Sequence, residues 1–252
     1  MSEYFTPAPP RVLAHRGLAL DAPENTLLAF AAALNAGVTH LETDVHGSAD
    51  GVAMVSHDPD LVRMAGRSVR IDQLTSHELR RVALGSGQGY CSLAEMLDAF
   101  PEARVNIDVK AASAIPGTIA AIRDARATDR VLIGSFSDAR RRGVVDALPG
   151  VATSASSSSA RAAVLAARAG IGPAVRRALV GVQAVQIPPR VGRVATLTAG
   201  SVARFHDAGV EVHAWTINEP DEMARLLDLG VDGLVTDRAD LAVGLLRSRG
   251  VG

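Results

Sequence analysis

Short apolar segments rich in β-branched residues alternate along this chain with longer segments rich in Ala, Leu and Arg that have a helical period. Such alternation is typical of βα units, in which a buried strand is followed by a helix that packs on the sheet. Helices are therefore expected between the strands, the first over about 24–36, before Gly37, and the last over about 240–246. Eight segments are predicted to be the main strands: residues 11–14, 40–45, 104–109, 131–135, 151–154, 184–187, 210–215 and 233–236.

Eight strands separated by helices predict a closed barrel, because eight parallel strands close this kind of fold over about 250 residues. The chain has 252 residues, of which 48% are hydrophobic, so it can fill one core of that size. We therefore predict the α/β class and a single (β/α)₈ TIM-type barrel domain over residues 1–252. An open, doubly wound parallel sheet is the alternative that the same pattern allows.

Two parts of the chain depart from the alternation of strands and helices. Residues 1–10 are predicted to be an N-terminal extension, and about 51–90 a small insertion after the second strand. The insertion begins at the turn signal Asp50-Gly51 with an extended segment at 52–56, and helical patterns follow at 76–83 and 93–100. Residues 66–89 have the weakest pattern, and we expect them to cover one end of the barrel.

Polar residues occur where the predicted strands end, which is where barrel enzymes place their active sites. Side chains two residues apart on a strand share one face, so pairs spaced in this way lie together. The candidates are His15 and Arg16 after the first strand, Glu42 and Asp44 in the second, His57 after the extended segment, Asp108 and Lys110 at the end of the third, and Trp215 at the end of the seventh.

Three of the candidates, Glu42, Asp44 and Asp108, are carboxylates. Oxygen ligands of this kind suit Mg²⁺ or Ca²⁺. Glu42 and Asp44 lie among apolar neighbours, and buried carboxylates on one face repel each other unless a cation lies between them. We therefore predict a divalent metal, Mg²⁺ or Ca²⁺, at these three residues. The alternative for Glu42 and Asp44 is the solvated face of an edge strand.

The remaining polar candidates suit phosphoryl chemistry. Arg16 offers several donors to a phosphate, and Lys110 is a compact point charge. Of the 26 basic residues, 25 are arginine and Lys110 is the one lysine, which favours a role for this position. His15 and His57 can exchange protons near neutral pH.

At these residues the chain resembles the glycerophosphodiester phosphodiesterase family. The resemblance covers nearly the whole chain and is weakest between 150 and 184. The matching motifs, in order, are His15-Arg16-Gly17, Pro23-Glu24-Asn25-Thr26, Glu42-x-Asp44-Val45, Asp50-Gly51, His57-Asp58, Asn106-Ile107-Asp108-Val109-Lys110, Trp215-Thr216-Ile217-Asn218 and Gly230-Val231-Asp232-Gly233-Leu234-Val235-Thr236-Asp237.

The resemblance implies metal ligation and proton transfer at specific positions. It makes His15 and His57 the general acid and base, and Glu42 and Asp44 two metal ligands. Asp108 takes the place of a third ligand that is usually Glu. Because Asp is one methylene shorter, water could link this carboxylate to the metal, and metal affinity or preference could differ from the family norm.

The resemblance also implies how the substrate is held and cleaved. Arg16 and Lys110 would bind the phosphate, and Trp215 would line the glycerol pocket unless it is core packing. Glu24 and Asn25 are further candidates for the site, although Asn25 also suits a helix cap. The implied reaction is attack of the glycerol 2-hydroxyl on phosphorus, and water then opens the cyclic phosphate to give glycerol 3-phosphate and an alcohol.

Charge and composition limit the classes of binding partner that we expect. With 26 basic and 27 acidic residues, the formal net charge of −1 favours neither nucleic acid nor an anionic membrane, so the expected partner is a small-molecule glycerophosphodiester. We see no signal peptide pattern and no apolar stretch long enough to cross or stably anchor in a membrane, and we expect a cytoplasmic protein. Cys91 cannot form an internal disulfide and is not expected to be a nucleophile. No oligomeric state or preferred head group is assigned.

Two other functions are alternatives to hydrolysis of small glycerophosphodiesters. Lysophospholipase D or phospholipase-C-like activity on acylated lipids would need an apolar ramp or insertion near the rim, and aromatic residues make up only 3% of the chain. A non-catalytic barrel that binds a phosphate ligand or a protein would require the loss of an essential group, and none is missing. Hydrolysis of small glycerophosphodiesters is therefore the function we expect.

Overall fold

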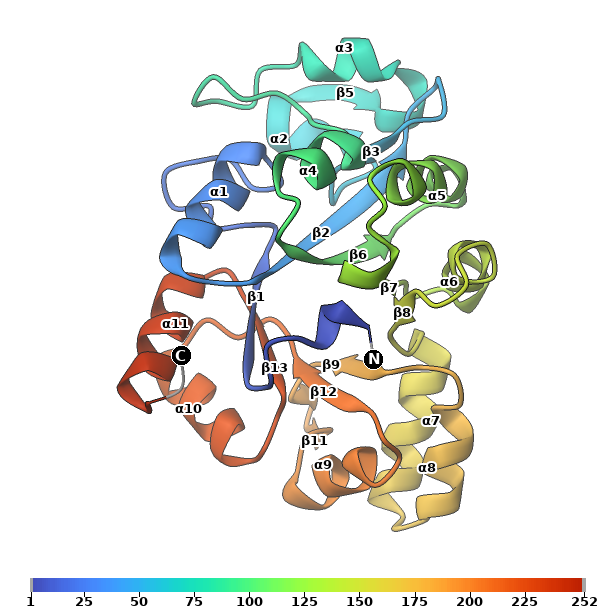
Figure 1. Cartoon of the computed structure of the whole chain (residues 1–252), viewed down its shortest axis with the longest axis vertical. Helices are drawn as coiled ribbons and strands as arrows, with labels where there is room; N and C mark the ends of the chain where they lie inside the picture. Colours follow the sequence, from blue (N-terminus) through green and yellow to red (C-terminus); the bar gives the residue numbers. More distant parts are fainter. Residues whose placement is uncertain (1, 251–252) are drawn as a thin grey trace.

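The computed structural model describes residues 2–250 and forms a parallel β-barrel surrounded by helices (Figure 1). Neighbouring strands pair in the order β8-β7-β6-β2-β1-β13-β12-β9. A parallel bridge between Ser154 and Ala184 joins the two ends of this order, so the barrel is nearly closed. Within residues 2–250, the eight barrel strands are β1 (Arg11–His15), β2 (His40–Gly47), β6 (Arg104–Val109), β7 (Val131–Gly134), β8 (Ala152–Thr153), β9 (Ala184–Ile187), β12 (Glu211–Ala214) and β13 (Gly233–Thr236).

Helices cover the outside of the barrel and bury its outward-facing apolar side chains, such as Leu41, Val105 and Val212, which are fully buried. They are α1 (Leu27–Ala36), α4 (Leu93–Ala99), α5 (Ile115–Asp124), α6 (Asp138–Val145), α7 (Ser157–Arg168), α8 (Gly172–Ala178), α9 (Ala199–His206), α10 (Pro220–Asp228) and α11 (Ala239–Ser248), with short 3₁₀ turns η3 (Ala112–Ala114) and η4 (Thr128–Arg130). None of the helices described is long and apolar enough to span a bilayer.

The predicted (β/α)₈ barrel is confirmed, and the open sheet is excluded. The strands at 104–109, 184–187 and 233–236 have the predicted bounds. The first helix begins three residues later than predicted, because the Thr26 hydroxyl accepts a hydrogen bond from the Ala29 amide and caps it there. Gly37 ends this helix in the left-handed conformation, as predicted.

The segment after β2 forms a small unit beside the barrel, at the top of Figure 1. It comprises β3 (Ala53–Val55), which pairs antiparallel with β2, then β4 (Asp60–Leu61), α2 (Val62–Ala65), β5 (Arg67–Arg70), η2 (Ile71–Gln73) and α3 (Ser76–Arg80). Its own hydrophobic cluster includes Met54, Leu61 and Leu79. The unit thus extends β2 past the barrel and places His57 beside the strand ends.

The N-terminal segment packs at the amino-terminal end of the barrel. Its 3₁₀ turn η1 (Glu3–Phe5) buries Tyr4 completely, against Leu132, Ala152 and Ala184. In Figure 1 this dark blue segment lies over the middle of the barrel. The extension therefore covers the end of the barrel opposite the strand ends that carry the polar candidates.

One buried histidine at the amino-terminal end of the barrel makes the free energy of unfolding depend on pH. His40 Nε2 lies 2.8 Å from the Tyr4 carbonyl oxygen, and Nδ1 lies 2.9 Å from the Thr39 hydroxyl. Burial lowers the pKa of His40 from 6.5 to about 3. The folded chain therefore keeps this ring neutral at pH values where the unfolded chain protonates it. The stability that this provides is complete above pH 6.5 and is lost as the pH falls toward 3.

We predict that replacing His40 by Gln will flatten this pH dependence. Between about pH 6 and 4, His40 alone should reduce the free energy of unfolding by about 1.4 kcal/mol per pH unit. Urea unfolding of the parent and His40→Gln at several pH values measures the difference between the two slopes. Equal slopes would show that His40 does not stay neutral in the folded chain.

Candidate active site

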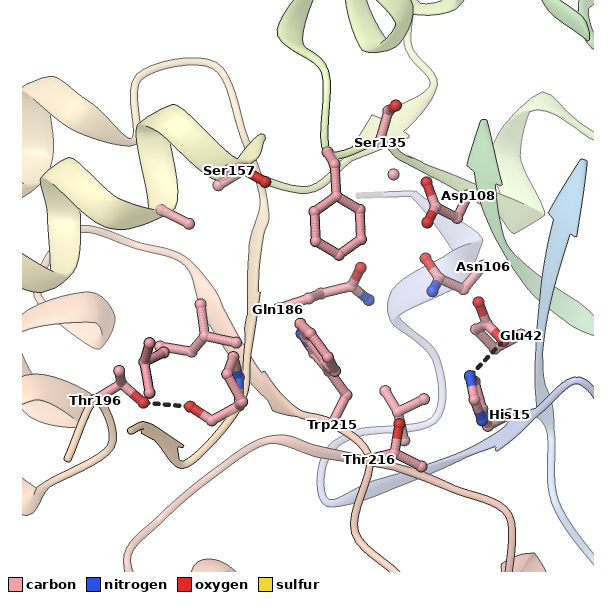
Figure 2. Close-up of a pocket in the computed structure, with 18 of the residues that line it drawn as sticks. His15, Glu42, Asn106, Asp108, Ser135, Ser157, Gln186, Thr196, Trp215 and Thr216 are labelled. Atoms are coloured by element: carbon pink, nitrogen blue, oxygen red, sulfur yellow. Dashed lines mark hydrogen bonds and ion pairs between the residues drawn. The ribbon is translucent and has the colours of Figure 1, made fainter. Parts of the chain in front are cut away.

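A cavity of about 790 Å³ opens at the carboxyl ends of the barrel strands. Figure 2 shows part of its lining, with side chains that converge from several strands. Eight of the polar and aromatic candidates line it: His15, Arg16, Glu42, Asp44, His57, Asp108, Lys110 and Trp215. The structure therefore brings together residues that are up to 200 positions apart in the sequence.

A tight turn after β1 aims the first two candidates. Arg16 and Gly17 have positive φ angles of 57° and 86°. A Cβ atom at Gly17 would lie 2.6 Å from the backbone carbon of Ala29, so glycine is required where the turn packs on α1. The Arg16 amide donates to the Glu42 backbone oxygen at 3.0 Å and to its Oε2 at 3.2 Å. The turn thus fixes β1 to β2 at the site.

Two cations hold the carboxylates in this structure. Lys110 Nζ lies 2.8 Å from Asp44 Oδ1 and 2.6 Å from Asp108 Oδ2, so it bridges β2 and β6. Arg16 Nε lies 3.2 Å from Asp44 Oδ2. Glu42 is nearly buried, and its nearest cationic partner is His15 Nε2 at 4.0 Å. Glu42 is therefore the least compensated of the three acids.

The pKa values reflect this crowding. Burial, followed by the charge of Asp44, raises the pKa of Glu42 to about 8. Burial also raises the pKa of Asp108, although Lys110 opposes it. Burial lowers the pKa of Lys110, but Asp44 and Asp108 outweigh this and raise it to about 12. An added positive charge near Glu42 would favour its ionised form.

The residues present fit a divalent metal by their chemistry but are not arranged around one. Three carboxylates lie in one cavity, and two buried oxygens, Asn106 Oδ1 and Asp108 Oδ1, have no hydrogen-bond partner. Such hard oxygen donors are those that Mg²⁺ and Ca²⁺ prefer. Within residues 2–250, however, no three His, Cys, Asp or Glu side chains form a group that could hold an ion as they stand. Metal binding would therefore require Lys110 or a carboxylate to shift.

Each candidate histidine has a carboxylate at its Nδ1. His15 Nδ1 lies 2.6 Å from Asp237 Oδ1, and His57 Nδ1 lies 2.8 Å from Asp58 Oδ1. A carboxylate there accepts a hydrogen bond from Nδ1–H and leaves Nε2 as the ring nitrogen available for proton exchange. Burial alone would lower the pKa of His15, but the hydrogen bond with Asp237, with the charge of Glu42, outweighs burial and raises it.

Asp237 is itself held in place. Its Oδ2 accepts a hydrogen bond from Asn218 Nδ2 at 2.7 Å, and its amide donates to Asn218 Oδ1 at 2.9 Å. The hydrogen bond from His15 lowers the pKa of Asp237, so the carboxylate stays ionised. In the sequence, Asp237 and Asn218 were recognised only as parts of matching motifs, and no role was assigned to either. Their position after the ends of the last two strands was the signal that could have identified them.

Glu24 and Asn25 support the site from behind the cavity lining. Glu24 Oε1 accepts from Arg16 Nη1 at 3.0 Å and from Arg63 Nη2 at 2.6 Å. Asn25 Nδ2 lies 3.4 Å from Asp44 Oδ2, and the helix cap is Thr26 instead. Direct contact of these two residues with a substrate stays a prediction.

The side of the cavity beyond Lys110 is aromatic. Phe136 and Trp215 meet edge to face with ring centroids 6.1 Å apart, and Lys110 Nζ lies 5.6 Å from the Phe136 centroid. Sequence reasoning missed Phe136, because it follows β7 in a segment that matched no motif. Asn106 was named there only as part of a matching motif, although it shares the face of Asp108 two residues away on β6.

Comparisons with known proteins show the family to which the chain belongs. The model of the "Glycerophosphoryl diester phosphodiesterase family" matches residues 15–241. "Probable glycerophosphodiester phosphodiesterase 2" of Mycobacterium tuberculosis (strain ATCC 25618 / H37Rv) is 43% identical over 240 residues, which are 94% of this chain and 91% of that protein.

Solved structures share the fold. A "Putative glycerophosphoryl diester phosphodiesterase" from Silicibacter pomeroyi DSS-3 superposes with a TM-score of 0.80 and 26% identity, covering 98% of this chain and 96% of that one. An Oleispira antarctica phosphodiesterase, solved in complex with the product sn-glycerol-3-phosphate, has a TM-score of 0.78 and 22% identity, with 95% and 97% covered.

The contact between His15 and Asp237 leads to a prediction. Asp237→Asn removes the negative charge at Nδ1, so the pKa of His15 should fall. An NMR titration of the His15 ring in protein treated with EDTA measures this directly. Asp240→Asn, at a carboxylate that pairs with Arg238 instead, is the control and should leave the titration unchanged. An unchanged His15 pKa in Asp237→Asn would rule out this contact.

Proposed function

We propose that His15 and His57 transfer protons across a phosphate held by Arg16 and Lys110, next to a divalent metal. The premise is that this chain belongs to the glycerophosphoryl diester phosphodiesterase family and hydrolyses glycerophosphodiesters. The products are glycerol 3-phosphate and an alcohol. The observation that carries this proposal is the pair of histidines, each with its own carboxylate, in one cavity with both cations.

The histidines divide the proton transfers. One ring takes the proton from the attacking hydroxyl, and the other gives a proton to the oxygen of the departing alcohol. Asp237 and Asp58 keep Nδ1 protonated, so Nε2 is the atom that exchanges protons. The attacking group would be the glycerol 2-hydroxyl, and the same two rings would then reverse roles while water opens the cyclic phosphate.

Arg16 and Lys110 would bind the phosphate oxygens. Both cations line the cavity and are largely buried, so their charges are only partly screened by water. In the unliganded structure they pair with Asp44 and Asp108. A phosphate would therefore compete with these carboxylates for the cations, and it is favoured when the carboxylates find another positive partner.

A divalent metal would be this positive partner. Glu42, Asp44 and Asp108 would bind it, with Asn106 Oδ1 as a further donor. A Mg²⁺ or Ca²⁺ ion held there would supply positive charge to the phosphate oxygens. The raised pKa of Glu42 supports this assignment, because burial and the charge of Asp44 cause it and a bound cation would offset both. The expected cytoplasmic location stays a prediction.

We predict that His15→Ala and His57→Ala will each lower kcat on glycerophosphocholine by about 10²- to 10⁴-fold, the usual contribution of a general acid or base. EDTA should abolish release of glycerol 3-phosphate, and added Mg²⁺ or Ca²⁺ should restore it. His206→Ala is the matched control, since His206 is partly exposed and pairs with Asp232 outside the cavity. Full activity in either histidine variant would exclude that residue as a catalytic group.

The short side chain of Asp108 leads to a separate prediction. Asp108→Glu restores the usual length and should tighten binding of Mg²⁺ or Ca²⁺, whereas Asp108→Asn should weaken it by about 10-fold or more. Titration calorimetry on metal-free protein, without substrate, measures the three Kd values. If parent and variants bind the metal equally well, Asp108 is not part of the site.

A further inference from the structure

The interior of the barrel contains a chain of polar side chains, although bulky aliphatic residues usually fill this space. Arg11 and His213 are almost completely buried, and Glu211, which contacts both, is largely buried. They come from β1 and β12, which lie on either side of β13. Burying such groups is unfavourable unless each is paired, and an aliphatic core would avoid this cost. The chain ends at a residue of the cavity, Gln186.

The contacts in this chain determine which atom donates at each step. Arg11 Nε and Nη2 donate to the two oxygens of Glu211 at 2.9 and 2.6 Å. His213 Nε2 lies 3.1 Å from Glu211 Oε2. Burial alone would raise the pKa of Glu211, but the hydrogen bonds from Arg11 and His213 outweigh it and lower the pKa to about 2. An ionised carboxylate can only accept, so Nε2 of His213 carries the proton.

The proton on Nε2 fixes the orientation of the Gln186 amide. In the neutral ring, Nδ1 of His213 then has no proton and can only accept. It lies 3.2 Å from Gln186 Nε2, which therefore donates to it. Within residues 2–250 this is the hydrogen bond that the Gln186 side chain makes, and it leaves the amide oxygen, Oε1, free to accept.

The backbone leaves room for this arrangement. Gln186 on β9 lies opposite His213 on β12, and a Cβ atom at Gly233 on β13 would come within 2.8 Å of His213 Cδ2. A Cβ atom at Gly134, where β7 ends, would lie 3.6 Å from Gln186 Oε1, so glycine there leaves this oxygen open to the cavity. Figure 2 shows Gln186 among the side chains that project into the cavity. The chain continues from β9 into the hairpin of β10 (Arg190–Val191) and β11 (Val194–Ala195), which also lines it.

We propose that Gln186 Oε1 accepts a hydrogen bond from the free terminal hydroxyl of the glycerol in the substrate, and that His213 is the positioning residue that turns the amide for this role. This inference rests on the proposed function and names a specificity-determining residue for it. His213 does not touch the substrate. It acts through the orientation of Gln186, and Glu211 and Arg11 act through His213.

The terminal hydroxyl suits a fixed acceptor of this kind. It takes no part in the proposed reaction, since the 2-hydroxyl attacks and the third glycerol oxygen carries the phosphate. Head groups differ between substrates, but every glycerophosphodiester carries this glycerol hydroxyl. Arg16 and Lys110 can only donate, and in the unliganded structure they occupy Asp44 and Asp108. Gln186 Oε1 is an acceptor that neither cation holds.

The test compares glycerophosphocholine with the phosphocholine diester of propane-1,2-diol, which keeps the attacking hydroxyl and lacks only the terminal one. The parent should prefer glycerophosphocholine by about tenfold in kcat/KM, because the analogue leaves the acceptor without its partner. Gln186→Leu should reduce this preference to about twofold or less, since the effects of the two deletions are coupled. Gln88→Leu, at a glutamine outside the cavity, is the control and should keep the preference of the parent.

A second pair of variants tests the positioning role. His213→Phe keeps a ring of similar size but can neither donate nor accept, so the Gln186 amide is free to turn. The preference for glycerophosphocholine should fall to about threefold or less. His40→Gln replaces another buried histidine of the barrel, which contacts Tyr4 instead, and should keep the preference of the parent.

NMR of the His213 ring nitrogens in the parent needs no variant that could misfold. It should show a proton on Nε2 and none on Nδ1. A proton on Nδ1 would turn Gln186 Oε1 toward the ring and would overturn the positioning role.

The outcomes separate this inference from the proposed function. Equal turnover of both diesters by the parent, or an equal fall with both in Gln186→Leu, would overturn the inference alone. Glycerophosphoglycerol adds a further comparison, because its head group also carries hydroxyls. If Gln186→Leu changes only the preference for this substrate over glycerophosphocholine, the acceptor serves the head group and the assignment to the substrate glycerol is wrong. No turnover of any substrate would overturn the proposed function and this inference with it.

Discussion

The surplus of negative charge at one end of the barrel is the constraint on which the site depends. Glu42 and Asp44 are almost completely buried, and Asp108 lies beside them on the next strand. Buried anions are unfavourable unless cations and hydrogen bonds compensate them. Lys110 and Arg16 provide two positive charges for three carboxylates, and Arg16 also pairs with Glu24. The remaining imbalance appears at Glu42, whose pKa rises to about 8. A site of this composition favours either a proton or a cation at Glu42.

The register of two parallel strands creates this concentration of charge. In the pairing of β2 with β6, Asp44 lies opposite Asp108 and Glu42 lies opposite Asn106. Neighbouring strands are about 4.8 Å apart, so side chains at one level of adjacent strands are close enough to share a cation. A shift of one residue would turn the acids of one strand to the other face and place apolar residues in the cavity. The packing of Leu41, Val45 and Val105 between barrel and helices therefore also fixes the site, because these core residues set the register.

Much of this could be predicted from the sequence, since strands and their polar ends are local patterns. The bounds of β6, β9 and β13 and all eight cavity-lining candidates follow from periodicity and motif order.

What could not be predicted depends on contacts made only after the barrel closes. Asp237 meets His15 across 222 positions, and no local pattern pairs them. Leu165 and Val191 resemble ordinary apolar residues of a helix and a hairpin, and their exposure depends on how those elements pack around the cavity. The same holds for Tyr4, which is buried in the barrel although it lies in an extension without a core pattern.

The two histidines are held by different parts of the chain, and this difference has a consequence for how the site is assembled. His15 depends on Asp237 after the last strand, so its orientation requires β1 and β13 to pair. His57 and Asp58 belong to the unit after β2, whose apolar cluster is separate from the main core. Arg63 joins this unit to the barrel, because it binds Asp58 and Glu24 together, and Glu24 in turn holds Arg16. The position of His57 relative to Arg16 is thus set both by the pairing of β3 with β2, which ends two residues before His57, and by this chain of ion pairs.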